Sequence, residues 1–152
     1  MSAMKKIIKL LLAAVCAAAL SVTFASCSGE QKSVSYTDGT YTGRSSDFKE
    51  DESGNGAGYG TVEIEIKDNR ITACTFKMYE LDGTLKDESY GVDLSKENRL
   101  KAQKAVQSAD KYAVLLVKSG SIDGVDVISG ATISCNEFKE AVNDALSKAA
   151  KG

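Results

Sequence analysis

The sequence predicts one α+β domain, in which an antiparallel sheet with a central hairpin packs against two main helices. Residues 61–67 alternate strictly between apolar and polar side chains, which is the pattern of a half-buried strand. An Asp-Asn pair then forms a tight turn, and residues 70–79 run back as the second strand of the hairpin. Two longer segments, at about 96–117 and after residue 132, carry apolar residues at the spacing of amphipathic helices.

The other elements follow from local patterns. Residues 36–43 are rich in Thr and Tyr and predict a first strand that is interrupted by an Asp-Gly turn. Residues 45–58 are polar, acidic and rich in glycine, which indicates a mobile surface loop. Both faces of the 70–79 segment carry apolar residues, so we expect this strand at the centre of the sheet. Residues 122–128 are expected to form a short strand or loop that leads into the final helix.

The first helix is expected to end at Gly120, because glycine is a usual helix stop. Its buried side is predicted to consist of Leu100, Ala105, Tyr112, Leu115 and Leu116. The second helix has an apolar stripe formed by Phe138, Ala141, Val142, Ala145, Leu146 and Ala149. Ser134 and Glu137 have the S-x-x-E spacing of a capping box, which predicts that Thr132 lies just before this helix starts.

The N-terminus has the pattern of a secretory signal, with a basic start, a short apolar centre and small residues after it. The apolar stretch, about 10–20, is shorter than the roughly 20 residues that a spanning helix needs. Residues 23–27 resemble a bacterial lipobox, in which Cys27 is lipidated and becomes the mature N-terminus. An ordinary cleavage site near Ala25 is the alternative.

These patterns divide the chain into a lipoprotein signal peptide (1–26), a tether (27–35) and one folded domain (36–152). The tether is polar and has no apolar periodicity, as a flexible link requires. We therefore expect an exported protein, anchored by its lipid to the outer face of the bacterial cytoplasmic membrane or to the cell surface. The lipid is its only expected contact with the membrane.

The charge argues against nucleic acid as a partner. The whole chain carries 19 basic and 21 acidic residues, a net charge of −2. Loss of Lys5, Lys6 and Lys9 with the signal leaves a mature protein of net charge −5. An acidic surface does not neutralise phosphates and does not favour broad contact with anionic lipid.

The chain contains no histidine, so it lacks the commonest metal ligand and the commonest acid–base residue. Cys16 and Cys27 belong to the leader, and only Cys74 and Cys135 belong to the domain. We expect no metal site from two cysteines without histidine. The two thiols either form a disulfide, as export would permit, or are separate small core residues.

Residues 126–134 predict a phosphate-binding loop that enters a helix. The free backbone N–H groups and the positive end of the helix dipole would lie close to the hydroxyl of Thr132. Gly130 can adopt a positive φ, and neither it nor Ala131 has the bulk to block a cofactor. The alternative is a helix-start loop that is simply rich in hydroxyl caps.

The same stretch resembles the acceptor motif of FMN-binding domains, D-x-x-[S/T]-G-A-T, over residues 126–132. Residues 38–43 resemble the first strand of that family and residues 58–66 resemble the next one, so the likeness extends over about 36–149. The family includes covalent-flavin subunits of ion-pumping NADH:quinone oxidoreductase and of Rnf complexes, and flavin-bearing lipoproteins of extracellular electron transfer. The lipobox makes this chain most similar to the lipoproteins.

The resemblance implies a role for each residue of the motif. Thr132 would carry FMN through a phosphoester bond. Ser129, Gly130 and Ala131 would shape the phosphate pocket. Asp126 would be part of what a flavin transferase recognises, and that enzyme would use FAD as its donor.

Tyr59 and Tyr90 stand beside glycines and are the candidates to flank the flavin ring, although each also fits a place in the core or at its rim. The resemblance implies an electron carrier, rather than a stand-alone enzyme, that takes electrons from a membrane dehydrogenase or the quinone pool and passes them to an external acceptor. Two alternatives stay open. One is a non-redox surface lipoprotein that serves as a binding or antigenic module, and the other is a reversible FMN binder.

Overall fold

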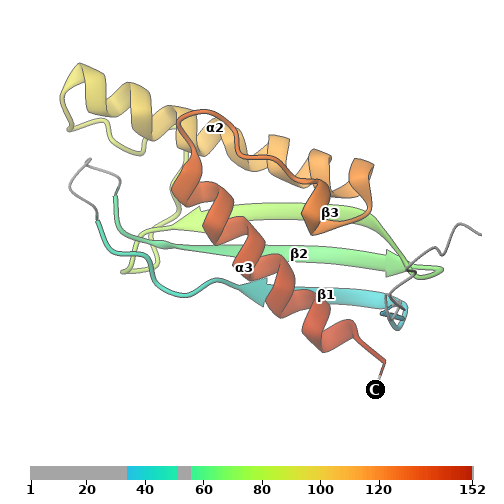
Figure 1. The fold of residues 1–152 in the computed structure, drawn as a ribbon. Helices are drawn as coiled ribbons and strands as arrows, with labels where there is room; N and C mark the ends of the chain where they lie inside the picture. The colour runs from blue at the N-terminus through green and yellow to red at the C-terminus, as the bar shows by residue number, and fades with distance from the viewer. Residues whose placement is uncertain (1–33, 51–55, 152) are drawn as a thin grey trace, which may run out of the picture. The chain divides into compact units, whose positions relative to one another are not determined.

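The computed structural model describes residues 34–50 and 56–151 of the 152-residue chain (Figure 1). The predicted signal peptide, the lipobox with Cys27 and most of the tether lie outside these residues. None of the described helices is long and apolar enough to cross a membrane.

Three strands form an antiparallel sheet in the order β1-β2-β3: β1 (Gly39–Arg44), β2 (Tyr59–Lys67) and β3 (Arg70–Tyr79). Asp68 and Asn69 join β2 to β3 with positive φ angles of 51° and 60°. Such a turn matches the twist of paired strands. The predicted hairpin and the α+β class are therefore confirmed.

The expectation that the 70–79 strand is central is wrong, because β2 is the middle strand and β3 is an edge of the described sheet. A bulge between β2 and β3 explains the misleading pattern. Ile66 pairs with Ile71 and Glu65 pairs with Ala73, so Thr72 is an extra residue that shifts the alternation. Ile71 thereby joins the buried side, and only one face of β3 is apolar.

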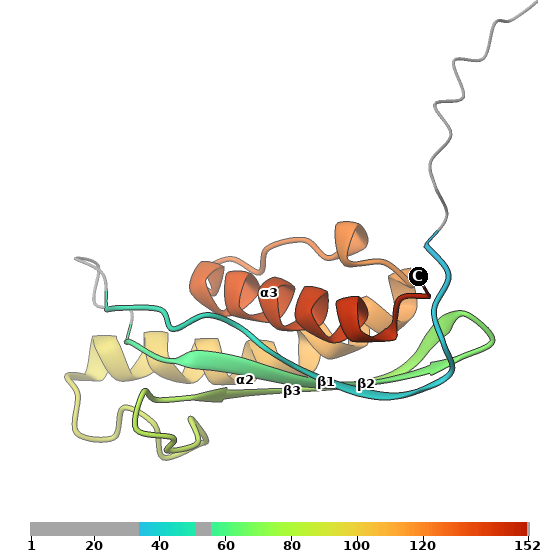
Figure 2. The ribbon, with the colours of Figure 1, turned by 90° about the horizontal axis from the view of Figure 1, so that it is seen from below.

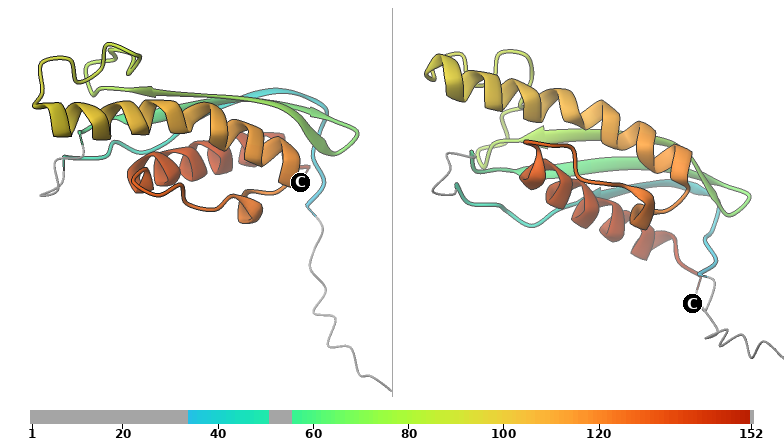
Figure 3. Two further views of the ribbon diagram at one scale, coloured as in Figure 1. Left: turned by 90° about the horizontal axis from the view of Figure 1, so that it is seen from above. Right: turned by 45° about the horizontal axis from the view of Figure 1, so that its top comes forward.

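Two helices, α2 (Lys96–Ser119) and α3 (Thr132–Ala149), cover the same face of the sheet (Figure 2). Figure 3 shows α3 crossing β1 and β2 while α2 runs along β3. The core between the layers is formed by the inward side chains of the strands and by Tyr112, Leu116, Phe138, Ala141, Val142 and Ala145. The outward face of the sheet is mostly polar and exposed.

Helix α2 ends as predicted at Gly120, whose φ of 69° is left-handed and whose N–H donates to the carbonyl of Leu116. A short 3-10 helix, η1 (Ile122–Gly124), and a loop then lead to α3. One predicted core residue is wrong, since Leu100 is 65% exposed. The buried residues of α2 all lie in its C-terminal half, from Ser108 to Leu116, where the helix faces the sheet and α3.

Helix α3 lies unusually close to β1. A Cβ atom added to Gly43 would lie 1.9 Å from the carbonyl oxygen of Ala141 and 2.6 Å from the nitrogen of Ala145. Only glycine fits at such a backbone approach. Gly43 and the two alanines therefore set the height of α3 above the sheet.

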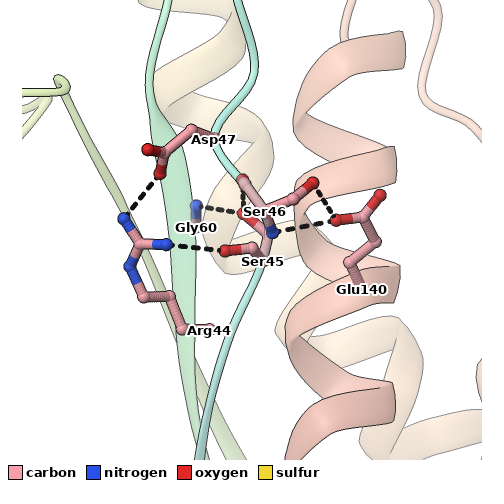
Figure 4. A network of polar contacts seen from close by, with 6 residues as sticks. All are labelled: Arg44, Ser45, Ser46, Asp47, Gly60 and Glu140. Atoms are coloured by element: carbon pink, nitrogen blue, oxygen red, sulfur yellow. Dashed lines mark hydrogen bonds and ion pairs between the residues drawn. The ribbon is translucent and has the colours of Figure 1, made fainter.

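A polar network fixes the chain that follows β1 (Figure 4). The N–H of Gly60 donates to Ser45 Oγ at 2.9 Å. Ser46 donates twice to Glu140 Oε2 on α3, from its N–H at 2.9 Å and from its hydroxyl at 2.6 Å. The beginning of the predicted mobile loop, 45–58, is thus attached to both β2 and α3.

The two ends of the described domain lie side by side. Tyr36 pairs with Ala150 in an antiparallel bridge. The N–H of Thr37 donates to the carbonyl of Ala149, and the N–H of Lys151 donates to that of Ser35, both at 2.8 Å. The segment that enters the domain is therefore clamped to the last turn of α3.

Cys74 and Cys135 are free thiols in the structure, which agrees with the alternative of two separate residues and not with a disulfide. Cys135 is buried and Cys74 is half-buried. Burial raises the pKa of the Cys74 thiol to about 12. Within 34–50 and 56–151, no group of three potential ligand side chains could hold a metal ion.

Candidate cofactor-binding site

Thr132 is the first residue of α3, and its side chain is exposed. The prediction that the helix begins after Thr132 at a capping box is wrong. The N-cap is Ala131, which has no side-chain bond to the helix, and Ser134 and Glu137 are buried on the inner side of α3. An S-x-x-E pattern caps a helix only when its serine is the N-cap, and here the helix starts earlier. The hydroxyl of Thr132 still lies at the positive end of the helix.

The turn before Thr132 is built around Gly130, whose φ of 78° favours glycine. The N–H of Ala131 closes this turn by donating to the carbonyl of Ile128 at 2.9 Å. A Cβ on Gly130 would lie 3.0 Å from Nζ of Lys104 on α2. The bare glycine therefore lets a lysine ammonium group approach the loop that carries Thr132, a favourable place for an anion.

Tyr112, on α2, forms hydrogen bonds to the first and the last residue of this turn. Its hydroxyl donates to the carbonyl of Ala131 and accepts from the N–H of Ile128, each at 3.0 Å. The tyrosine is fully buried, and its ring stacks on Phe138. Burial raises the pKa of the Tyr112 hydroxyl to about 12, so the group is a neutral hydrogen-bonding residue. Sequence reasoning placed Tyr112 in the core and missed this contact, because the hydroxyl bonds a loop 16–19 residues away.

A cavity of about 740 Å³ opens beside Thr132. Its walls are the connection after β3, the N-terminal half of α2 and the first turns of α3. Pockets that hold cofactors and small molecules typically measure roughly 300–1,000 Å³. The cavity is therefore large enough for a mononucleotide whose phosphate is attached at the rim.

The structure brings some of the predicted site residues to this cavity. Thr132, Ala131, Gly130 and Tyr90 line it. Ser129 lies in the turn itself and Asp126 in the loop before it; both are exposed, and neither lines the cavity.

Tyr59 also lies away from the cavity, on the outward face of β2. Its ring stacks on that of Tyr79 with centroids 5.3 Å apart, and the Arg44 guanidinium lies 3.8 Å from its centroid. Of the two tyrosines predicted to flank a flavin ring, the structure thus places only Tyr90 beside the candidate site.

Sequence reasoning missed two buried charged residues in the cavity wall, Lys86 and Glu137. Glu137 is 1% exposed, and its Oε1 has no hydrogen-bond partner among the described residues. Burial raises the pKa of Glu137 to about 7, an effect that Lys86 opposes and Glu140 reinforces. Burial likewise lowers the pKa of Lys86, while Glu137 and Glu80 act to raise it.

Alternating glycines just before β2 make room for side chains of the cavity wall. A Cβ on Gly56 would lie 2.1 Å from the Tyr90 hydroxyl, and one on Gly58 would lie 2.5 Å from Nζ of Lys86. Sequence reasoning used Gly58 and Gly60 only for the family resemblance. Their spacing of two residues puts both on one side of an extended chain, which was the available signal that side chains from other elements pack there. A ligand with its own polar groups could bond the unpaired buried carboxyl oxygen, and the glycines leave space beside it.

The comparisons with known proteins agree with this geometry. The family model of the FMN-binding domain matches residues 55–147, which include Thr132 and most of the cavity wall. The crystal structure of the CPE2226 protein from Clostridium perfringens has a similar fold, with a TM-score of 0.55 and 24% identity over 75% of this chain and 88% of that one. No curated protein matches significantly. The chain therefore belongs to the FMN-binding domain family and is a flavin-binding protein with FMN as its cofactor.

Proposed function

We propose that the protein carries FMN covalently, through a phosphoester to Thr132, and passes electrons from a membrane donor to an external acceptor. The observation that carries this proposal is the position of Thr132. Its hydroxyl is exposed at the N-terminus of α3 and lies on the rim of a cavity large enough for the cofactor. An incoming transferase can reach such a hydroxyl, whereas a buried one is closed to it.

The attachment is a group transfer from FAD, catalysed by a flavin transferase. The Thr132 oxygen forms a bond to the phosphorus of the FMN half, the pyrophosphate bond breaks, and AMP leaves. The hydroxyl proton goes to solvent or to the transferase. The linked phosphate keeps one negative charge, which the first N–H groups of α3 and the ammonium group of Lys104 are placed to stabilise.

The bound flavin would supply the redox chemistry, and the protein would supply position and surroundings. Gly130 and Ala131 keep the rim free of bulk, and Tyr112 fixes the turn that presents Thr132. The acidic surface of the mature protein should disfavour a negatively charged reduced flavin and so lower its potential. Charge-reversal variants that leave the potential unchanged would contradict this expectation.

Export and lipid anchoring belong to the same proposal. The lipobox at Cys27 would hold the domain at the membrane, close to a dehydrogenase or the quinone pool as donor. FMN that dissociates outside the membrane is diluted away, and a covalent bond prevents that loss. Lipid attachment is tested by the mass of the N-terminal peptide after expression with its leader, beside a Cys27→Ser variant.

The covalent link is tested by the intact mass of the mature domain after co-expression with an active flavin transferase. We expect the mass of one FMN less one water on the parent chain and no addition on Thr132→Ala. Thr75→Ala, an exposed threonine on β3, is the matched control and should be loaded like the parent. An unmodified parent chain would refute the covalent link.

The two alternatives give different results in the same preparation. A non-redox surface lipoprotein would be colourless after purification. A reversible FMN binder would be yellow but would lose its flavin on denaturation.

A further inference from the structure

The covalent link accounts for Thr132 but leaves a buried polar site in the cavity wall without a role. This site consists of Lys86 and Glu137, and we call it the Lys86–Glu137 site. Glu137 is 1% exposed and Lys86 is 8% exposed, and both line the cavity. Glu137 Oε1 has no partner within the described residues, and the Lys86 ammonium group donates one hydrogen bond there, to the carbonyl of Gly56 at 3.3 Å.

The position of the site follows from the helix that carries Thr132. Glu137 is five residues beyond Thr132 on α3, which places it about 7.5 Å further along the helix axis. Lys86 reaches the same wall from the connection after β3. The site therefore lies deeper in the cavity than the rim that would hold the phosphate.

Two glycines leave space in the backbone around the site for these two side chains. A Cβ on Gly60 would lie 3.0 Å from Cβ of Glu137, and one on Gly58 would lie 2.5 Å from Nζ of Lys86. A buried carboxyl oxygen without a partner destabilises a fold, and native structures rarely keep one without a reason. A ligand that bonds this oxygen would remove the penalty.

We propose that the Lys86–Glu137 site binds the polar edge of the flavin ring. The pyrimidine half of isoalloxazine presents an N–H group between two carbonyl oxygens. Glu137 accepts a hydrogen bond from this N–H, and the Lys86 ammonium group donates to a neighbouring carbonyl. The inference rests on the proposed function, because it needs FMN in this cavity with its phosphate at Thr132.

The charges around the site are compatible with that contact. Glu137 faces Lys86 from the connection after β3 and Glu140 from its own helix, while Glu80 at the end of β3 acts on Lys86. The Lys86 ammonium group also lies 5.0 Å from the ring centroid of Tyr90. A carboxyl group offers an accepting oxygen whether it is protonated or not, so the contact survives the titration of Glu137.

The test uses the flavin-loaded protein and replaces both members of the site, Lys86→Met with Glu137→Leu. Replacing both charged residues by apolar side chains avoids a lone buried charge, so we expect the flavin-free fold to be as stable as before or more so. The matched control is Lys67→Met with Glu65→Leu, on the exposed face of β2. Loading of each sample is verified by intact mass before any other measurement.

The readout is the access of acrylamide to the flavin, measured by fluorescence quenching. In the double variant the ratio of docked to undocked ring should fall about tenfold, as expected for the loss of hydrogen bonds to charged groups. The control should match the parent chain, and the thermal midpoint of the flavin-free double variant should not fall.

Three outcomes would go against the inference. A loaded double variant whose ring is as protected as in the parent overturns the inference alone. A double variant whose flavin-free form is clearly destabilised assigns the two residues a structural role and also overturns it. A parent chain that gains no flavin mass refutes the covalent function, and the inference falls with it.

Discussion

Tyr112 offers a direct test of how the attachment turn is held. Replacing Tyr112 with Phe keeps the stacked ring and deletes one hydroxyl. That hydroxyl donates to the carbonyl of Ala131 and accepts from the N–H of Ile128, each at 3.0 Å, and the residue is fully buried. The substitution therefore leaves the N–H of Ile128 without a partner, whereas the carbonyl of Ala131 keeps its bond from the N–H of Cys135 at 3.0 Å.

The size of the effect follows from these two bonds. A buried polar group that loses its partner costs about 1–3 kcal/mol. We expect Tyr112→Phe to lower the free energy of unfolding by about 2–3 kcal/mol, from one orphaned N–H and the loss of one of the two bonds to the Ala131 carbonyl. For a domain of this size that corresponds to a fall of roughly 10 °C in Tm.

Tyr41→Phe is the matched control. The Tyr41 hydroxyl also makes a 3.0 Å bond, to the carbonyl of Thr37, but at an exposed position where water can replace it. We expect a loss of less than about 1 kcal/mol there. Urea unfolding of the flavin-free domain measures both variants. Equal losses in the two would refute the reasoning, since the Tyr112 hydroxyl is buried and makes two bonds, whereas the Tyr41 hydroxyl makes one bond at an exposed position.

Three further predictions concern packing, pH and charge. Gly43→Val should prevent α3 from docking on β1 and cost about 3 kcal/mol or more, seen as loss of the cooperative unfolding transition, because its Cβ would lie 1.9 Å from the carbonyl of Ala141. The pKa of Glu137 is raised from 4.5 to about 7, so between these pH values the folded chain binds a proton that the unfolded chain has lost. The free energy of unfolding should therefore fall by about 3 kcal/mol as the pH rises from about 4.5 to 7. Glu137→Gln should remove most of this pH dependence, as measured by urea unfolding at a series of pH values. Lys104→Met should slow flavin loading a few-fold at low salt and less at high salt, whereas Lys111→Met on the same helix should load at the parent rate; equal rates for both variants would exclude a role for the Lys104 charge.

The elements that the sequence predicted well depend on neighbours in the chain. Strict alternation in residues 61–67 and an Asp-Asn pair that tolerates positive φ are sufficient for the β2–β3 hairpin. The stripe of α3 and the glycine at the end of α2 are equally local signals. The motif with Gly130 and Thr132 is also a local signal, because the two residues are two positions apart, and their role in binding the flavin stays a prediction.

The features that the sequence did not predict depend on contacts between distant segments. The bulge that shifts the alternation of β3 is visible only once the partner strand is known. Glu137 was assigned to a capping box because the local spacing fits one, yet the helix starts earlier and buries it. Lys86 joins Glu137 in the cavity from 51 positions away, and its burial contradicts the usual exposure of lysine.

The clamp between Tyr36 and Ala150 sets how the domain can meet a membrane-bound donor. The clamp is at the last turn of α3 and Thr132 is at its first, so 18 helical residues, or about 27 Å, separate the attachment threonine from the point where the chain enters the domain. With the proposed anchor at Cys27, the cofactor end would be held away from the bilayer unless the whole domain tips over. The length and stiffness of the tether would then set the local concentration of flavin at the donor.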